Sequence, residues 1–208
     1  MVIMPKVSVA VLASGRGSNF QAIQDAIARG ECDAQIKVLI SNKSDAGAID
    51  LAKGYGIATE IVERKSFKTR EMMDERIKAL LDSYKVDLVV LAGYMVVLKS
   101  KKLIDAYRGK IINIHPSLLP SFPGVDAQRQ AFDYGAKVSG VTIHLVDESL
   151  DAGPILYQEA VYIGDCTSDG DVSERILELE HQSYAKVVHS FSKGRYVVEG
   201  RRARFVPY

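Results

Sequence analysis

The chain has 208 residues and a formal net charge of +1, with 27 basic and 26 acidic side chains. This near-neutral balance argues against a nucleic-acid partner or an acidic membrane surface. No stretch approaches the roughly 20 apolar residues that a membrane helix needs. The chain has two cysteines, no visible signal peptide and no spacing typical of a metal site. We therefore expect a single cytoplasmic domain without a metal.

The first half of the sequence alternates apolar, β-branched runs with amphipathic segments. Ser18 and Gln21 fit a capping box at the start of the first helix, and Gly30 fits its end. The order predicts an α/β fold with a doubly wound, mostly parallel sheet. Strands are expected at residues 7–13, 36–40, 57–62, 86–91 and 111–114, and helices at 18–30, 46–53, 69–84 and 100–107.

The pattern changes after residue 115. A proline-rich loop leads to a short helix at 126–134, and strands at 138–146 and 155–163 follow, joined by a loop at 147–154. These strands are expected to be antiparallel or mixed. A long final helix is expected to begin at a cap on Asp171 and to reach about residue 192, followed by a hairpin or tail containing Val197 and Phe205.

A glycine-rich turn stands where the first strand enters the first helix, at residues 15–19. Backbone N–H groups and the helix dipole make such a point a natural anion site. The third glycine of the dinucleotide fingerprint is missing, because Phe20 occupies that place. A tight turn with a good cap is an equally simple interpretation of the same residues.

Asn113 and His115 lie two residues apart at the expected end of a parallel strand, so both side chains share one face. Ligands bind at this end of open α/β sheets. An amide donor beside an imidazole suits a reaction that develops an oxyanion at a carbonyl. The alternative is a buried pair satisfied by the backbone.

Two carboxylates are further candidates. Asp151 lies in a loop of small residues, and near His115 it would favour the charged imidazole and order a water; a plain turn residue is the alternative. Glu180 falls in register with the apolar stripe of the last helix, where it would need a partner. Vicinal ribose hydroxyls and a nearby basic residue are equal candidates for that partner.

Three histidines remain. His144 is interpreted as a core or pocket-wall residue, His189 as a surface or helix-end residue, and His181 is left open.

Several motifs resemble those of one family. The run Asn-Ile-His-Pro-Ser-Leu-Leu-Pro at 113–120 resembles the signature of folate-dependent formyltransferases, and residues 142–146 with Asp-Ala-Gly-Pro at 151–154 resemble their second signature. Residues 15–19, 41–46 and 91–95 narrow the likeness to glycinamide ribonucleotide formyltransferases. It extends from about residue 6 to about residue 198. The resemblance implies one Rossmann-like formyltransferase domain over 1–208, with a phosphate-binding half at about 6–112 and a folate-binding, catalytic half at about 113–200.

The resemblance also implies two small-molecule substrates, 5-phosphoribosylglycinamide and the co-substrate 10-formyltetrahydrofolate, in a monomer or homodimer that binds no nucleic acid, membrane or metal. The implied catalytic residues are Asn113, His115 and Asp151. The residues implied to hold the ribonucleotide are Gly17, Ser18, Asn19 and Glu180. The implied folate contacts are Arg70, Met95, Val96, Val97, Leu98, Asn113, Asp147, Glu148, Ser149, Leu150 and Asp151.

The sequence departs from the family at two places. Val96 replaces an arginine of many relatives, which changes little if the backbone makes the contact. Leu177 replaces a polar residue of some relatives, which weakens a role at the phosphate. The alternatives are a formyltetrahydrofolate hydrolase, whose extra amino-terminal domain has no counterpart here, and a catalytically silent nucleotide-binding module. A methionyl-tRNA formyltransferase and a nicotinamide dehydrogenase fit less well.

Overall fold

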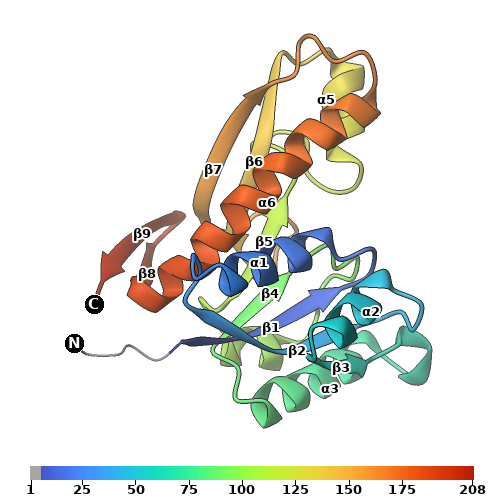
Figure 1. Ribbon diagram of the computed structural model, residues 1–208, viewed down its shortest axis with the longest axis vertical. Helices are drawn as coiled ribbons and strands as arrows, with labels where there is room; N and C mark the ends of the chain where they lie inside the picture. Colours follow the sequence, from blue (N-terminus) through green and yellow to red (C-terminus); the bar gives the residue numbers. More distant parts are fainter. Residues whose placement is uncertain (1–5) are drawn as a thin grey trace.

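The computed structural model describes residues 6–208, which form a nine-stranded mixed sheet flanked by helices (Figure 1). The strand order is β3-β2-β1-β4-β5-β6-β7-β9-β8. The strands are β1 Val7–Ala13, β2 Ala34–Ser41, β3 Ala58–Ile61, β4 Leu88–Leu91, β5 Ile111–His115, β6 Val138–Leu145, β7 Ile155–Tyr162, β8 Gly194–Glu199 and β9 Arg202–Pro207. The helices are α1 Ser18–Ala28, α2 Gly47–Gly54, α3 Arg70–Ser83, α4 Lys101–Ala106, α5 Ala127–Tyr134 and α6 Asp169–Lys193, with a 3₁₀ turn at Arg64–Ser66.

The predicted doubly wound sheet is confirmed. The strands β1 to β5 pair in parallel, whereas β6 is antiparallel to both β5 and β7. Helices α1, α2 and α6 cover one face of the parallel half, with Phe20, Ile49 and Tyr184 in the shared core. Helices α3 and α4 cover the other face through Met73, Leu103 and their neighbours. Both faces are buried, which is why β1 and β4 are almost wholly apolar.

The long helix α6 connects the two halves of the molecule. It runs beside β6 and β7, contacts α5 at its start, and packs against α1 towards its end (Figure 1). The hydroxyl of Tyr184 donates to the carbonyls of Leu91 and Ile112 at 2.8 and 3.2 Å. The helix is therefore fixed to β4 and β5, the strands that lead into the candidate site.

Two predicted helix starts are wrong in detail. The N-cap of α1 is Gly17, with φ 85°, and Ser18 makes no capping bond because it is already the first helical residue. In α6 the capping box consists of Ser168 and Asp171, so Asp171 is the third helical residue and not the cap. Ser168 was overlooked because Asp171 is an equally good cap in sequence.

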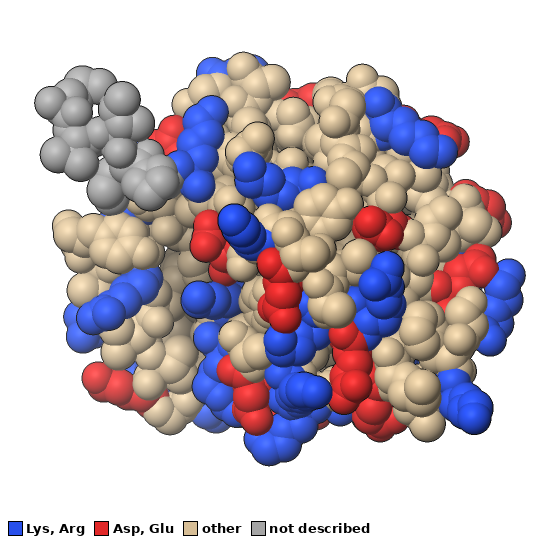
Figure 2. Space-filling model, turned by 90° about the horizontal axis from the view of Figure 1, so that it is seen from below, with Lys and Arg blue, Asp and Glu red and all other residues tan. Residues whose placement is uncertain are grey.

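The surface carries mixed charge. On the face shown in Figure 2, Lys and Arg side chains are interspersed with Asp and Glu, in keeping with the net charge of +1. None of the described helices has the length and apolar content required to cross a membrane.

Candidate active site

The candidate site lies where β1, β4 and β5 end. Parallel strands bring their carboxyl ends to one edge of a sheet, and the loops that follow them meet there. Ser14 after β1 donates its side-chain hydroxyl to Asn42 after β2 at 2.6 Å, and the same oxygen accepts from the backbone N–H of Met95 after β4 at 2.9 Å. The loops after three neighbouring strands are therefore tied together by one buried serine.

Asn113 on β5 lies directly opposite His144 on β6. Its amide nitrogen is 3.2 Å from Nε2 of His144, and Nδ1 of His144 is 2.9 Å from the carbonyl of Leu145. A carbonyl only accepts, so Nδ1 is the donor and Nε2 accepts from Asn113. Burial lowers the pKa of His144 and keeps this neutral form. The amide of Asn113 is thereby oriented, with a second N–H available to a ligand.

His115 ends β5 and is buried. Its Nε2 lies 2.8 Å from the carbonyl of Phe122, which fixes this nitrogen as a donor. Its Nδ1 lies 3.6 Å from Oδ2 of Asp151, and Nε2 of His144 lies 3.9 Å from Oδ1 of the same carboxylate. A protonated His115 would donate from both ring nitrogens. The structure thus brings together the predicted trio, two members on β5 and one from the loop after β6.

The loop that carries Asp151 is held tightly. Asp151 has φ 47°, and its Oδ2 accepts from the backbone N–H of Gly124 at 2.9 Å. A Cβ on Gly153 would lie 1.8 Å from the carbonyl oxygen of Leu145, so only glycine fits there. These contacts place the carboxylate against His115 at a cost in backbone strain, which is typical of functional loops.

The glycine-rich turn before α1 has the geometry of an anion site. A Cβ on Gly17 would lie 2.7 Å from the Cβ of Ala48 on α2, and its positive φ also favours glycine. Ser18 and Asn19 form the first turn of α1, where backbone N–H groups lack partners within the helix. Because Ser18 makes no capping bond, its hydroxyl is also available to a phosphate.

Glu180 points inward from α6 next to this turn. It is buried, and its Oε2 accepts from the side-chain amide of Asn19 at 2.7 Å. Burial raises the pKa of the carboxyl to about 7, and the bond from Asn19 opposes that rise. Oδ1 of Asn19 is itself buried without a partner in the described chain. This pair therefore offers several unused acceptor positions to hydroxyl donors, and no Lys or Arg among residues 6–208 forms an ion pair with Glu180.

Residues 95–98, which follow β4, form a wall of the candidate site on the side of helix α3. Arg70 donates to the carbonyl of Val97 at 3.1 Å. One turn later along α3, the buried Asp74 accepts from the backbone N–H groups of Lys99 and Ser100 at 2.5 and 2.9 Å. Burial raises the pKa of Asp74, although these two bonds oppose the rise. Helix α3 thus fixes both the middle and the end of this segment.

This segment and the loop of Asp147 to Leu150 each carry an exposed apolar side chain. Met95 is 71% exposed and Leu150 is 61% exposed, values that suit a surface covered by a ligand more than a solvated loop. In the loop of Asp147 to Leu150, the Asp147 carboxylate accepts from the N–H of Ser149 at 2.8 Å. Glu148 is 3.4 Å from Lys101 on α4, so this loop also contacts the helix that follows residues 95–98.

Residues 7–188 match the family model of formyl transferases. The chain belongs to the formyl transferase family. The phosphoribosylglycinamide formyltransferase of Bacillus subtilis (strain 168) is 43% identical over 179 residues, which cover 86% of this chain and 91% of that protein.

Solved structures of formyltransferase relatives have the same fold. The crystal structure of glycinamide ribonucleotide transformylase 1 from Symbiobacterium toebii gives a TM-score of 0.93 at 39% identity and covers 97% of this chain and 94% of that one. A formyltetrahydrofolate deformylase from Pseudomonas syringae pv. tomato gives 0.87 at 28% identity, with 96% of this chain and 66% of that one covered.

Three residues of the candidate site were not predicted from the sequence. His144 was interpreted as a wall residue, but it orients Asn113. Asp74 was not singled out, since an acidic residue on a surface helix is usually solvated. Ser14 directly precedes the predicted glycine-rich turn and was given no role, although it ties together the loops after β1, β2 and β4. The cross-strand position of His144 could have been found by aligning the two family signatures on antiparallel strands; nothing in the sequence marks the other two.

Proposed function

We propose that the chain transfers the formyl group of 10-formyltetrahydrofolate to the amine of 5-phosphoribosylglycinamide. It is a phosphoribosylglycinamide formyltransferase of purine biosynthesis. The observation that supports the assignment of the site is the convergence of Asn113, His115 and Asp151 at the end of β5, two strands from the glycine-rich turn after β1 and next to the strand that leads to residues 95–98.

The ribonucleotide would bind on the side of α1. The N–H groups at Gly17, Ser18 and Asn19 would hold its phosphate, which is favoured by the helix dipole. Glu180 would accept from the ribose hydroxyls. This arrangement directs the glycinamide amine towards the end of β5.

The folate would bind on the opposite side, between residues 95–98 and the loop at 147–151. Met95, Val97 and Leu150 would supply exposed apolar surface, and Val96 and Leu98 would contribute backbone groups. Arg70 supports that wall through Val97. Since helix α3 supports the wall through backbone carbonyl and N–H groups, the valine at position 96 is compatible with this role.

Formyl transfer follows from the geometry at β5. The amine nitrogen attacks the formyl carbon, and the free N–H of Asn113 and a protonated His115 stabilise the oxyanion. His115, with Asp151 and a water, then moves a proton from the attacking amine to the departing folate nitrogen as the old C–N bond breaks. A preorganised donor of this kind is worth on the order of 10² to 10³ in rate.

Several further expectations belong to this proposal: a single domain with a phosphate-binding and a folate-binding half, a cytoplasmic location, a monomer or homodimer, and a reaction without a metal. The two cysteines form no disulfide, which fits a reducing compartment.

An absorbance assay of the purified protein with 10-formyltetrahydrofolate tests the proposal. Loss of the formyl group should require the ribonucleotide. Loss without it would indicate the hydrolase reaction of the deformylase relative, and ribonucleotide binding without turnover would indicate a silent binding module.

A further inference from the structure

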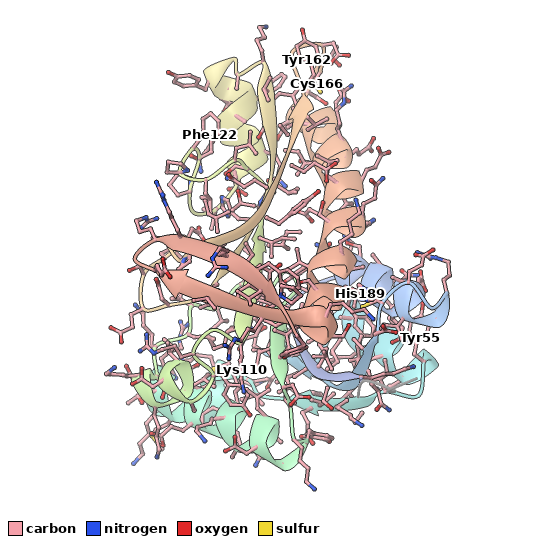
Figure 3. The ribbon with its side chains drawn as sticks, turned by 90° about the vertical axis from the view of Figure 1, so that its left-hand side faces the viewer. Tyr55, Lys110, Phe122, Tyr162, Cys166 and His189 are labelled. Carbon is pink, nitrogen blue, oxygen red and sulfur yellow. The ribbon has the colours of Figure 1, made fainter. Side chains whose placement is uncertain are left out.

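Strand β8 is an open edge of the sheet. Within residues 6–208 it pairs only with β9, and the hairpin crosses the near side of the molecule in Figure 3. Strand edges with free N–H and C=O groups pair readily with another strand, and proteins that avoid this place charged side chains, proline or bulges there. Strand β8 has no proline or bulge, and its two charged residues, Arg195 and Glu199, have opposite signs.

The backbone groups that face the open edge can be identified from the hairpin register. The N–H of Tyr208 donates to the carbonyl of Lys193 at 3.0 Å. Hydrogen-bonded pairs alternate along an antiparallel ladder, so Arg195, Val197 and Glu199 bond to β9. Tyr196 and Val198 therefore direct their N–H and C=O groups outward.

The side chains of β8 are arranged symmetrically about Val197. Arg195 precedes it by two residues and Glu199 follows it by two, both exposed and on the same face of the strand. Neither forms an ion pair within the described chain. If two copies of β8 paired antiparallel with Val197 facing itself, Arg195 of each would lie opposite Glu199 of the other. Tyr196 would lie opposite Val198 on the other face.

The register centred on Val197 also pairs the outward backbone N–H and C=O groups of the two strands. With Val197 at the centre, Tyr196 of one strand and Val198 of the other form hydrogen-bonded pairs, and every outward group of these residues finds a partner. A register centred on Tyr196 would place Arg195 opposite Val197, and one centred on Val198 would place Glu199 opposite Val197, so neither register pairs Arg195 with Glu199. Aromatic with β-branched pairs and opposite charges are favourable across strands.

We propose that β8 pairs with β8 of a second copy of this chain about a two-fold axis at Val197. The two sheets then form one continuous sheet through an isologous contact. The contact covers Val198, which is 41% exposed in the single chain. It lies outside the candidate active site, so variants of β8 should keep formyl transfer.

Sedimentation across a concentration series tests the pairing. The wild type should dimerise, and Arg195→Glu should raise the dimer dissociation constant at least about tenfold, since it places like charges at both ends of the contact. The double variant Arg195→Glu, Glu199→Arg exchanges the charges and should restore the wild-type constant. Arg204→Glu is the control: it lies opposite Val197 on β9, midway between the two charges, and should change the constant less than about twofold.

A cross-link tests the register directly. Val197→Cys would face its own copy in a non-hydrogen-bonded pair, where Cα atoms lie about 4.5 Å apart, close enough for a disulfide. Oxidation should therefore give a covalent dimer, whereas Val206→Cys on β9 should give none. A wild type that is monomeric at every concentration, a dimer insensitive to the charge changes, or Val197→Cys without cross-linking would each overturn the proposal.

Discussion

Replacing Glu180 by glutamine should stabilise the ligand-free protein and lower its affinity for the ribonucleotide. The carboxyl is buried, and its pKa rises to about 7 from an ordinary 4.5 because ionisation there is not solvated. Glutamine has nearly the same shape, can still accept from Asn19, and carries no charge. The substitution thus removes the cost of a buried charge and retains the hydrogen bond.

The change in the free energy of unfolding depends on pH because the pKa of Glu180 differs between the folded and the unfolded chain. Below pH 4.5 the carboxyl is neutral in both the folded and the unfolded chain, so it costs nothing. As the pH rises from 4.5 to about 7, the unfolded chain is ionised while the folded chain resists ionisation, so the folded state progressively loses about 3 kcal/mol. Glu180→Gln should recover this free energy above pH 7, which for a chain of this length is a rise in Tm of about 6 to 12 °C.

Thermal unfolding from pH 5 to pH 8 provides the measurement. The difference in Tm between Glu180→Gln and wild type should be small at pH 5 and grow towards pH 8. Glu178→Gln, an exposed neighbour on α6, should show no such growth. A variant less stable than wild type at pH 8 would refute the reasoning. In the wild type, ribonucleotide binding should weaken as the pH falls below about 7, because the protonated carboxyl accepts poorly from hydroxyls.

Further outcomes concern the other parts of the site. His115→Ala should fold and lose about 10² to 10³ in kcat; near-normal turnover would contradict its role. His144→Phe should lower kcat with little change in either KM, since it frees the Asn113 amide, and an effect on KM alone would contradict this. Asp74→Asn should raise the KM for the folate about tenfold and spare that for the ribonucleotide, whereas the exposed Glu75→Gln should change neither. Gly17→Ala should lower Tm and ribonucleotide affinity together; a fully stable variant would contradict the close contact with α2.

The parallel half of the fold could be predicted because its strands are short apolar runs between amphipathic helices. Buried strands leave this signal whatever surrounds them. The position of Asn113 and His115 could be predicted too, since a period of two places them on one face of a strand that ends at the binding edge. Glu180 was found by its register in an apolar stripe.

The features that could not be predicted from the sequence depend on contacts between residues that are distant along the chain. Ser18 and Gln21 fit a capping box, but the N-cap is one residue earlier, at Gly17, which packs against Ala48. Asp74 is buried by backbone donors 25 and 26 residues away, which no local pattern reveals. The role of His144 depends on which strand lies opposite Asn113.

The hydroxyl of Ser14 links the proposed phosphate site to the proposed folate site. Ser14 directly precedes the turn proposed to bind the phosphate. Its hydroxyl oxygen also accepts from the backbone N–H of Met95, in the segment 95–98 proposed to contact the folate. Occupancy of either pocket would restrict the same side chain, so each ligand would shift the affinity for the other. Because binding free energies form a closed cycle, this cooperativity must be equal in both directions.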